Sequence, residues 1–150
     1  MTTLGVFHDQ FYNAINVLPQ SSYKATTQNG GTLTAANLTG AGDVYLAASG
    51  QTAAQALTTD TAANIISQLQ FALSSAVPPS PPGVTNLTNL TYTLTLINNN
   101  TSSGAITLTG GTGVTITGTN TLSITTSRIF VVTVTSPSTV TFQNVGSATP

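Results

Sequence analysis

Charge is what this chain lacks most. Lys, Arg, Asp and Glu make up 3% of its 150 residues, whereas they make up about 25% of an average soluble protein. The five residues are Asp9, Lys24, Asp43, Asp60 and Arg128, and the formal net charge is -1. Affinity for nucleic acid grows with the number of Lys and Arg side chains that meet phosphates. Two basic residues argue against nucleic acid as a partner.

Residues that support catalysis or metal binding are also scarce. Cysteine and glutamate are absent and there is one histidine, which excludes disulfides and thiolate metal sites. His8 and Asp9 are adjacent, so their side chains diverge, and no GxSxG motif is present. The glycine-rich segment 110–119 lacks the lysine and the following helix of a phosphate-binding loop. We therefore expect no enzyme activity, no metal and no cofactor.

Long hydrophobic runs are missing too. The apolar stretches fall short of the roughly 20 residues that cross a bilayer. The first ten residues, MTTLGVFHDQ, have neither the basic region nor the continuous apolar run of a signal peptide. We expect synthesis in a cytoplasm and no membrane partner.

What the chain has in abundance is neutral hydrogen-bonding side chains on a β-branched background. It contains 31 threonines, and hydrophobic residues make up 39%. Disordered chains are poor in β-branched residues, so this composition predicts a folded protein. Hydroxyl and amide groups cost less to dehydrate than ions. Such a surface suits permanent contact with other proteins.

The first half of the chain has few regular patterns. Apolar residues at spacings of three and four in residues 4–18 fit either an amphipathic helix or an extended arm, and the sequence leaves both open. We expect residues 1–55 to be an N-terminal arm or docking segment, with a short strand at 44–47 and Asp43 in the turn before it.

A helix is predicted at residues 60–74, within a helix-containing segment 56–77. Its apolar stripe is formed by Ala62, Ile65, Ile66, Leu69 and Leu73. Thr59 is the expected N-cap, and Asp60 would lie in the first turn. The proline-rich stretch PPSPPG ends the helix, and residues 78–89 form the predicted linker.

From residue 91 onward the pattern changes to a period of two. Apolar residues alternate with threonine in six segments: TYTLTLI (91–97), AITLT (105–109), GVTIT (113–117), TLSIT (121–125), RIFVVTVT (128–135) and STVTFQNV (138–145). The predicted fold class is mainly β. We expect an antiparallel β-sandwich or small barrel in residues 90–150, with one or two short helices and an N-terminal arm.

Neutral strands rich in threonine and valine invite pairing with another chain, so we expect neighbouring chains to cover their edges. Arg128 is either a solvated charge at a strand end or a partner of an aspartate in another chain. The predicted partner-interface residues are Phe7, Phe11, Tyr12, Tyr23 and Arg128.

Two segments carry a resemblance to a known family. Residues 105–146 share a GTGVT turn, a Thr-Ser-Arg lead into an F-x-V-x-V strand and a final V-x-F-x-N-V-G, and residues 57–69, LTTDTAANIISQL, match the helix start that often precedes this module. These segments resemble capsid cement or decoration proteins of tailed bacteriophages, notably cyanophages. The resemblance implies a β-sandwich or barrel, often a homotrimer, that clamps the outer surface of major capsid subunits in the virion.

Two other functions remain as alternatives. One is a tail-fibre or spike module that recognises a host glycan, although the chain has no Trp and few other aromatic residues. The other is ice binding, suggested by Thr-x-Thr pairs such as Thr91/Thr93 and Thr115/Thr117. No fixed sequence period aligns these pairs, and β-propensity accounts for threonine.

Overall fold

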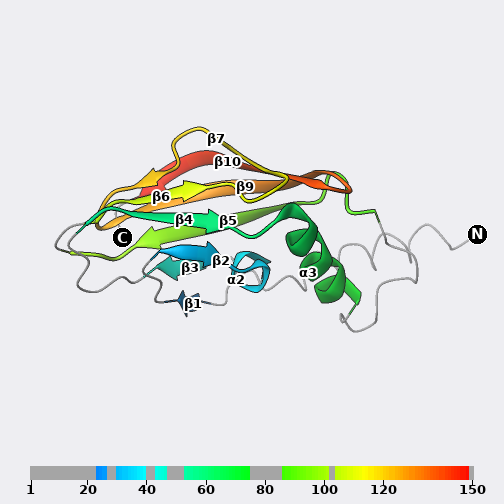
Figure 1. Ribbon diagram of the computed structural model, residues 1–150, viewed down its shortest axis with the longest axis horizontal. Helices are drawn as coiled ribbons and strands as arrows, with labels where there is room; N and C mark the ends of the chain where they lie inside the picture. Colours follow the sequence, from blue (N-terminus) through cyan, green and yellow to red (C-terminus); the bar gives the residue numbers. More distant parts are fainter. Residues whose placement is uncertain are drawn as a thin grey trace, which may run out of the picture.

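Ten strands and two helices make up the part of the chain that the computed structural model describes (Figure 1). The described residues are 23–26, 30–39, 43–46, 53–74, 86–101 and 104–148, with the backbone alone for 23–26, 43–46, 73 and 74. The helices are α2 (Ala35–Thr39) and α3 (Ala62–Ser74). The strands are β1 (Tyr23–Thr26), β2 (Gly31–Leu33), β3 (Asp43–Leu46), β4 (Gln55–Thr59), β5 (Thr91–Asn98), β6 (Ile106–Thr109), β7 (Val114–Thr117), β8 (Thr121–Leu122), β9 (Thr126–Ser136) and β10 (Thr139–Ala148).

The strands form two sheets that face each other as in a β-sandwich. Sheet A has the order β1-β3-β5-β9-β10-β7, and sheet B has the order β2-β4-β6-β8. The mainly β fold and the sandwich are confirmed, while the barrel alternative is not realised. In residues 90–150, where an antiparallel sandwich was expected, β5, β9 and β10 pair antiparallel, as do β6 and β8, but β7 pairs parallel with β10, so the expectation is wrong for that pair. Both sheets are mixed, because β1, β3 and β5 run parallel in sheet A, as do β2, β4 and β6 in sheet B.

Parallel pairing arises because the first six strands alternate between the sheets. The chain places β1 in sheet A and β2 in sheet B, continues through α2, and repeats the path with β3, β4 and α3 before β5 and β6. We name each pass of the chain through one strand of sheet A and the next strand, in sheet B, a coil. Within residues 1–55, which were expected to form an arm with one short strand, the described residues thus contribute β1, β2 and β3 to the two sheets, and β4 begins at Gln55.

The two helix starts share a four-residue sequence, which marks the same point in two successive coils. Residues 34–37 and 61–64 both read TAAN. In each, the threonine hydroxyl accepts a hydrogen bond from the backbone N–H of the asparagine. The N–H of Asn37 donates to Thr34 at 3.3 Å, and the N–H of Asn64 donates to Thr61 at 3.2 Å. This is the geometry of an N-cap. The pattern predictions missed this repeat, although the four shared letters were visible.

The predicted helix at 60–74 is confirmed, but its cap was wrongly placed. Thr59 is the last residue of β4, and Thr61 is the N-cap. Asp60 lies between strand and helix, where it is not in the first turn. Asp43 begins β3 instead of lying in a turn, and the strand expected at 44–47 is confirmed one residue earlier.

All six alternating segments contain strands, with one shortened. The segment 121–125 ends as a strand at Leu122, because the chain turns at residues 124 and 125, where Thr125 has a left-handed φ of 50°. Ile124, expected on the apolar face, is 36% exposed as a result.

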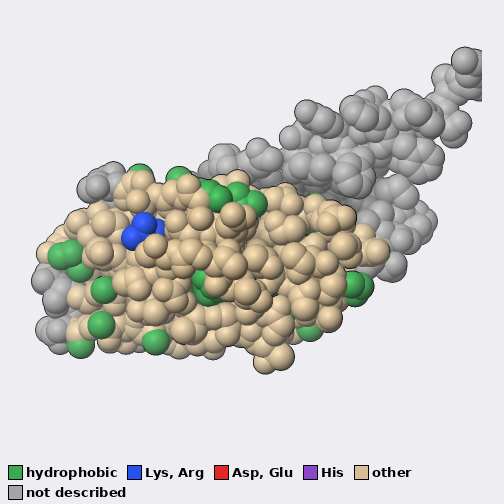
Figure 2. Space-filling model, turned by 90° about the horizontal axis from the view of Figure 1, so that it is seen from above, with side chains coloured by type: hydrophobic (Ala, Val, Ile, Leu, Met, Phe, Trp, Pro, Cys, Tyr) green, Lys and Arg blue, Asp and Glu red, His purple; other side chains and the backbone are tan. Residues whose placement is uncertain are grey.

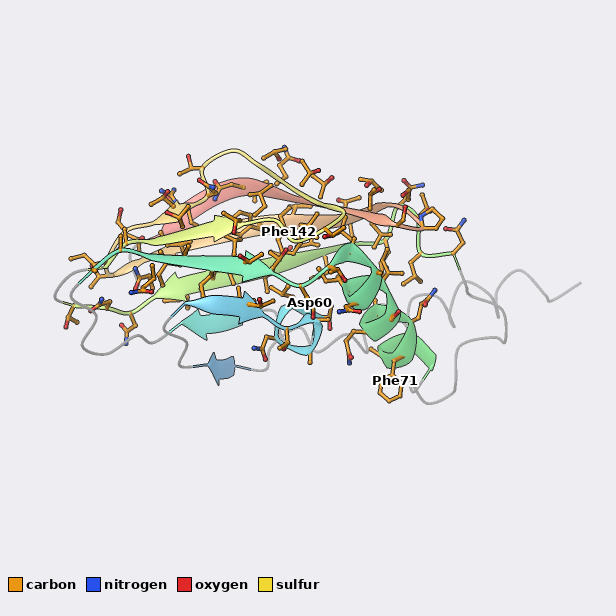
Figure 3. All side chains as sticks on the ribbon, viewed as in Figure 1. Asp60, Phe71 and Phe142 are labelled. Atoms are coloured by element: carbon orange, nitrogen blue, oxygen red, sulfur yellow. The ribbon has the colours of Figure 1, made fainter. Side chains whose placement is uncertain are left out.

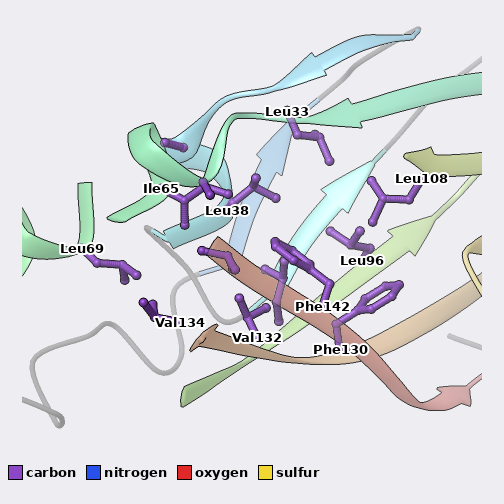
Figure 4. Packing of buried hydrophobic residues seen from close by; sticks show 14 of the residues in the cluster. Leu33, Leu38, Ile65, Leu69, Leu96, Leu108, Phe130, Val132, Val134 and Phe142 are labelled. Carbon is purple, nitrogen blue, oxygen red and sulfur yellow. The ribbon is translucent and has the colours of Figure 1, made fainter. Parts of the chain in front are cut away.

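The core lies between the two sheets and the inner sides of the helices (Figure 4). Its largest members are the inward-facing Phe130 of β9 and Phe142 of β10, whose rings meet edge to face at 6.3 Å. The helix stripe residues Ala62, Ile65, Ile66 and Leu69 are buried in the same cluster, while the side chain of Leu73 lies outside the described ones.

Candidate interaction surface

The predicted interface residues are only partly within the described structure. Phe7, Phe11 and Tyr12 lie outside the described residues. Tyr23 is the first residue of β1, where its backbone pairs with Asp43 of β3. Their role as partner contacts stays a prediction.

Arg128 connects the two sheets. On β9 its neighbours of the same parity, Phe130 and Val132, face the core, so Arg128 lies on the side of the strand that faces sheet B. Its Nε donates a hydrogen bond to the carbonyl oxygen of Thr121, on the edge strand β8, at 3.1 Å. The side chain is half-buried. The structure therefore gives Arg128 a role within the chain, and its predicted contact with a partner is untested.

Asp60 is also used within the chain, at the junction of the two helices (Figure 3). One carboxylate oxygen accepts from the backbone N–H of Ala35 at 2.9 Å, and the other accepts from the N–H of Thr61 and the side-chain amide of Asn64. Burial raises the pKa of this carboxyl, but the three hydrogen bonds outweigh burial and hold the pKa below its ordinary value. Asp60 thus ties the start of α2 to the start of α3.

The glycine-rich segment after β6 has a structural role as well. The carbonyl oxygen of Thr112 accepts a hydrogen bond from the N–H of Ala62 at the start of α3, and the N–H of Gly111 donates to Thr59 Oγ1, both at 2.9 Å. A Cβ on Gly111 would collide with the carbonyl oxygens of Thr59 and Asp60. The sequence predicted a hairpin turn here, and this prediction is wrong, because the segment carries the chain from β6 in sheet B to β7 in sheet A and the two strands do not pair.

The outer side of β5, β9, β10 and β7 in sheet A forms the first of two neutral surfaces, which we name the A face. It consists of the outward side chains of four neighbouring strands: Thr91, Thr93 and Thr95 of β5; Ile129, Val131, Thr133 and Thr135 of β9; Thr139, Thr141 and Gln143 of β10; and Thr115 and Thr117 of β7. All of them are half-buried or exposed. None carries an ionised group.

Strand register arranges the A face in rows. Thr91, Thr133, Thr141 and Thr115 are consecutive partners across β5, β9, β10 and β7, so one row consists of threonine alone. The hydroxyl oxygens of Thr91 and Thr133 lie 3.4 Å apart. Sheet pairing thus aligns Thr-x-Thr pairs that share no sequence period.

The second row of the A face mixes apolar and polar side chains. It runs through Thr93, Val131, Gln143 and Thr117. Beyond it, a β-bulge in β10 leaves Val145 without a register partner, and that side chain is 54% exposed. The A face therefore offers methyl groups as well as hydroxyls.

The outer side of sheet B, which we name the B face, has the same chemistry over a smaller area. Its rows are Thr32, Thr58 and Thr109, then Ala56, Thr107 and Thr121. Thr58 and Thr109 share a hydrogen bond at 3.0 Å between their hydroxyls, and Thr109 also donates to the carbonyl oxygen of Leu57. On the face seen in Figure 2, basic atoms at one place and scattered apolar side chains interrupt an otherwise uncharged surface.

No group of metal-binding side chains is found among the described residues. They contain no cluster of three or more His, Cys, Asp or Glu side chains that could hold a metal ion. The phenol of Tyr92 is buried without a hydrogen-bond partner, and desolvation raises its pKa. One large apolar side chain, Phe71, is 65% exposed on the outer side of α3 (Figure 3).

The described helices include none with the length and apolar character needed to cross a membrane. Comparisons with known proteins identify no relative: no protein-family model, no curated protein and no solved structure matches this chain.

Proposed function

We propose that this chain is a virion structural protein, a capsid cement or decoration protein that binds the outer surface of major capsid subunits and stabilises the shell. It would be made in the host cytoplasm and carried on the outside of the capsid, and it would act without catalysis, cofactor, nucleic acid or membrane. The likeness of residues 57–69 and 105–146 to phage cement proteins supplies the specific partner.

One observation carries the proposal: the described side chains of the A face and the B face include no ionised group, and the two ionised side chains that the structure describes are used inside the fold. Asp60 holds the helix starts together, and Arg128 joins the sheets. A freely dispersed domain usually keeps about a quarter or more of its surface charged. A surface of threonine loses its water at much lower cost than a charged one, which favours lasting contact with other subunits.

The test is a shell-stability measurement. Purified protein is added to shells assembled from the major capsid protein of the same virus, and the shells are then heated or exposed to osmotic shock. We expect saturable binding and a higher temperature of shell disruption, because a cement protein stabilises the assembled state by binding it.

Shells that bind no protein, or that break at the same temperature with and without it, would contradict the proposal. Glycan-array binding by the isolated protein, together with absence of shell binding, would instead favour a tail-fibre or spike module.

A further inference from the structure

We propose that the A face is the surface through which copies of this chain pack against one another. The inference deepens the proposed function and rests on it for its biological meaning, since a cement protein that self-associates binds its shell at several points. The occupant of the A face is then a second copy of the same face.

The chemistry of the A face suits contact with itself. A surface that carries charge of one sign repels its own copy, whereas the A face has no ionised group at any of its positions. Most of its side chains are Thr, Val or Ile, which lose little side-chain freedom on burial because they are stiff at χ1. Hydroxyls in the row from Thr91 to Thr115 can exchange hydrogen bonds with the hydroxyls of the facing copy.

The geometry suits it as well. Side chains on the facing sides of two packed sheets interdigitate, and the row of four threonines offers side chains of equal size for such packing. Next to it, Val131 provides the apolar centre, with Thr93 and Gln143 on either side in register. The mixed composition matches an interface with an apolar centre and a polar rim.

The A face is large enough for a specific contact between two copies. Three long strands and the short β7, spaced about 4.8 Å apart and rising about 3.3 Å per residue, give roughly 450 Å² of flat area per copy. Side-chain relief raises the total for two copies to about 1,000 Å², the lower limit of a specific interface. We therefore expect association that depends on concentration.

The B face provides a built-in comparison. It has similar threonine rows, but its strands are short, with three, five, four and two residues in β2, β4, β6 and β8. Its total area is correspondingly smaller, although it is equally neutral. A charge introduced there tests whether neutrality alone, at any place on the surface, causes association.

The experiment measures the mass of the full chain by light scattering and sedimentation velocity over a range of concentrations. We expect the unaltered protein to associate and T133K, with a lysine in the centre of the A face, to weaken association at least tenfold. The matched control T107K places the same lysine in the B face and should associate as the unaltered protein does. Far-ultraviolet circular dichroism and thermal melting establish that each variant is folded.

A mixing experiment keeps the inference testable if T133K is destabilised. T133K and T133D should each be monomeric alone and should associate when mixed, because opposite charges then meet across the contact. A dimer that responds in this way supports the inference, because contact between one A face and a second A face joins two copies.

Three results would overturn it: an unaltered protein that stays monomeric at its highest soluble concentration, a T133K variant that associates normally, or a T107K variant that dissociates equally. Shell binding is scored separately. Self-association without shell binding would contradict the proposed function and support the inference. Shell binding by a monomeric protein would support the proposed function and contradict the inference.

Discussion

The hairpin of β9 and β10 and the coils of β1 to β6 build the same two sheets by different means. In the hairpin, neighbouring strands follow each other in sequence, separated by a short turn at Ser136 to Thr139, and run antiparallel. In the coils, each strand pairs with one that lies a whole coil away, as Thr32 of β2 does with Thr58 of β4. One part of the sandwich is held by local pairing and the other by distant pairing.

The hairpin and the coils therefore depend on different interactions for their stability. The strands of the hairpin have 11 and 10 residues and bury large side chains such as Phe130 and Phe142. The strands of the first two coils have three to five residues, too short to hold a register by themselves. Helix caps and the segment after β6 supply the missing constraints.

The largest effect is expected in the hairpin core. Phe142→Ala removes a fully buried ring that packs against Phe130, and we expect the free energy of unfolding to fall by about 3–5 kcal/mol. Chemical denaturation monitored by circular dichroism measures it. The control Gln143→Ala changes the exposed neighbour and should stay within about 0.5 kcal/mol. Equal losses in both variants would show that the ring is not part of the core.

The next effect concerns the contact between coil and hairpin. Gly113 has a φ of 78°, and an added Cβ would lie 2.7 Å from the carbonyl oxygen of Ser138 and 2.9 Å from Cβ of Ala62. Gly113→Ala should cost about 2–4 kcal/mol, because left-handed strain and overpacking add.

A glycine with the same backbone geometry but more room is the control for Gly113. Gly118 has a φ of 80°, and its added Cβ would approach Asn144 Cβ at 3.2 Å. Gly118→Ala should cost about 1–2 kcal/mol, the strain alone. If both glycines respond equally in denaturation, crowding at the joint between coil and hairpin contributes nothing.

A smaller effect, which depends on pH, is expected where Asp60 joins the starts of the two helices. Asp60→Asn weakens the hydrogen bonds to the starts of α2 and α3 and should cost about 1–2 kcal/mol at neutral pH. The folded-state pKa of Asp60 lies below its ordinary value of 3.8, so its stabilisation is present above that value and is lost as the pH falls through the folded-state pKa.

Denaturation at a series of pH values measures this linkage. The difference in stability between the unaltered protein and Asp60→Asn should shrink as the pH is lowered below 3.8. A difference that is constant across this range would mean that the charge of Asp60 does not act through these hydrogen bonds.

The smallest effect compares the two TAAN caps. Thr61→Ala should destabilise by about 1 kcal/mol and Thr34→Ala by about 0.5 kcal/mol, because α3 has 13 residues that depend on the cap and α2 has five. Denaturation midpoints measure both losses. Serine at either position keeps the hydroxyl and should restore most of the stability. A larger loss at Thr34 than at Thr61 would reverse the expected order.

Local patterns predicted the part of the fold that depends on local pairing. Alternation located β5, β6, β7, β9 and β10, and the apolar stripe located α3 within two residues of its start. Prediction failed where pairing is distant: β1, β2 and β4 were not foreseen, and the parallel pairing of β7 with β10 was not expected in residues 90–150. The cap was misplaced because both Thr59 and Thr61 are suitable residues, and only the backbone decides which one begins the helix.

For the candidate interaction surface, too, local patterns predicted one part and distant strand pairing decided the rest. Near-absence of charge was evident from composition and predicted a neutral exterior. The Thr-x-Thr pairs seemed unrelated because Thr91, Thr115, Thr133 and Thr141 have no common spacing, and sheet register alone places them in one row. Arg128 was expected at a strand end, and its hydrogen bond to Thr121 depends on how the sheets face each other.

The sequence by itself determined most of the residues that face inward, because alternation and helical period are properties of neighbouring residues. It also determined that the exterior would be neutral. Only the tertiary structure decided which strands are neighbours, in which direction they run and which threonines share a face. Strand pairing joins residues across dozens of positions through backbone hydrogen bonds that every residue type except proline can make, so side-chain identity leaves the partner unspecified.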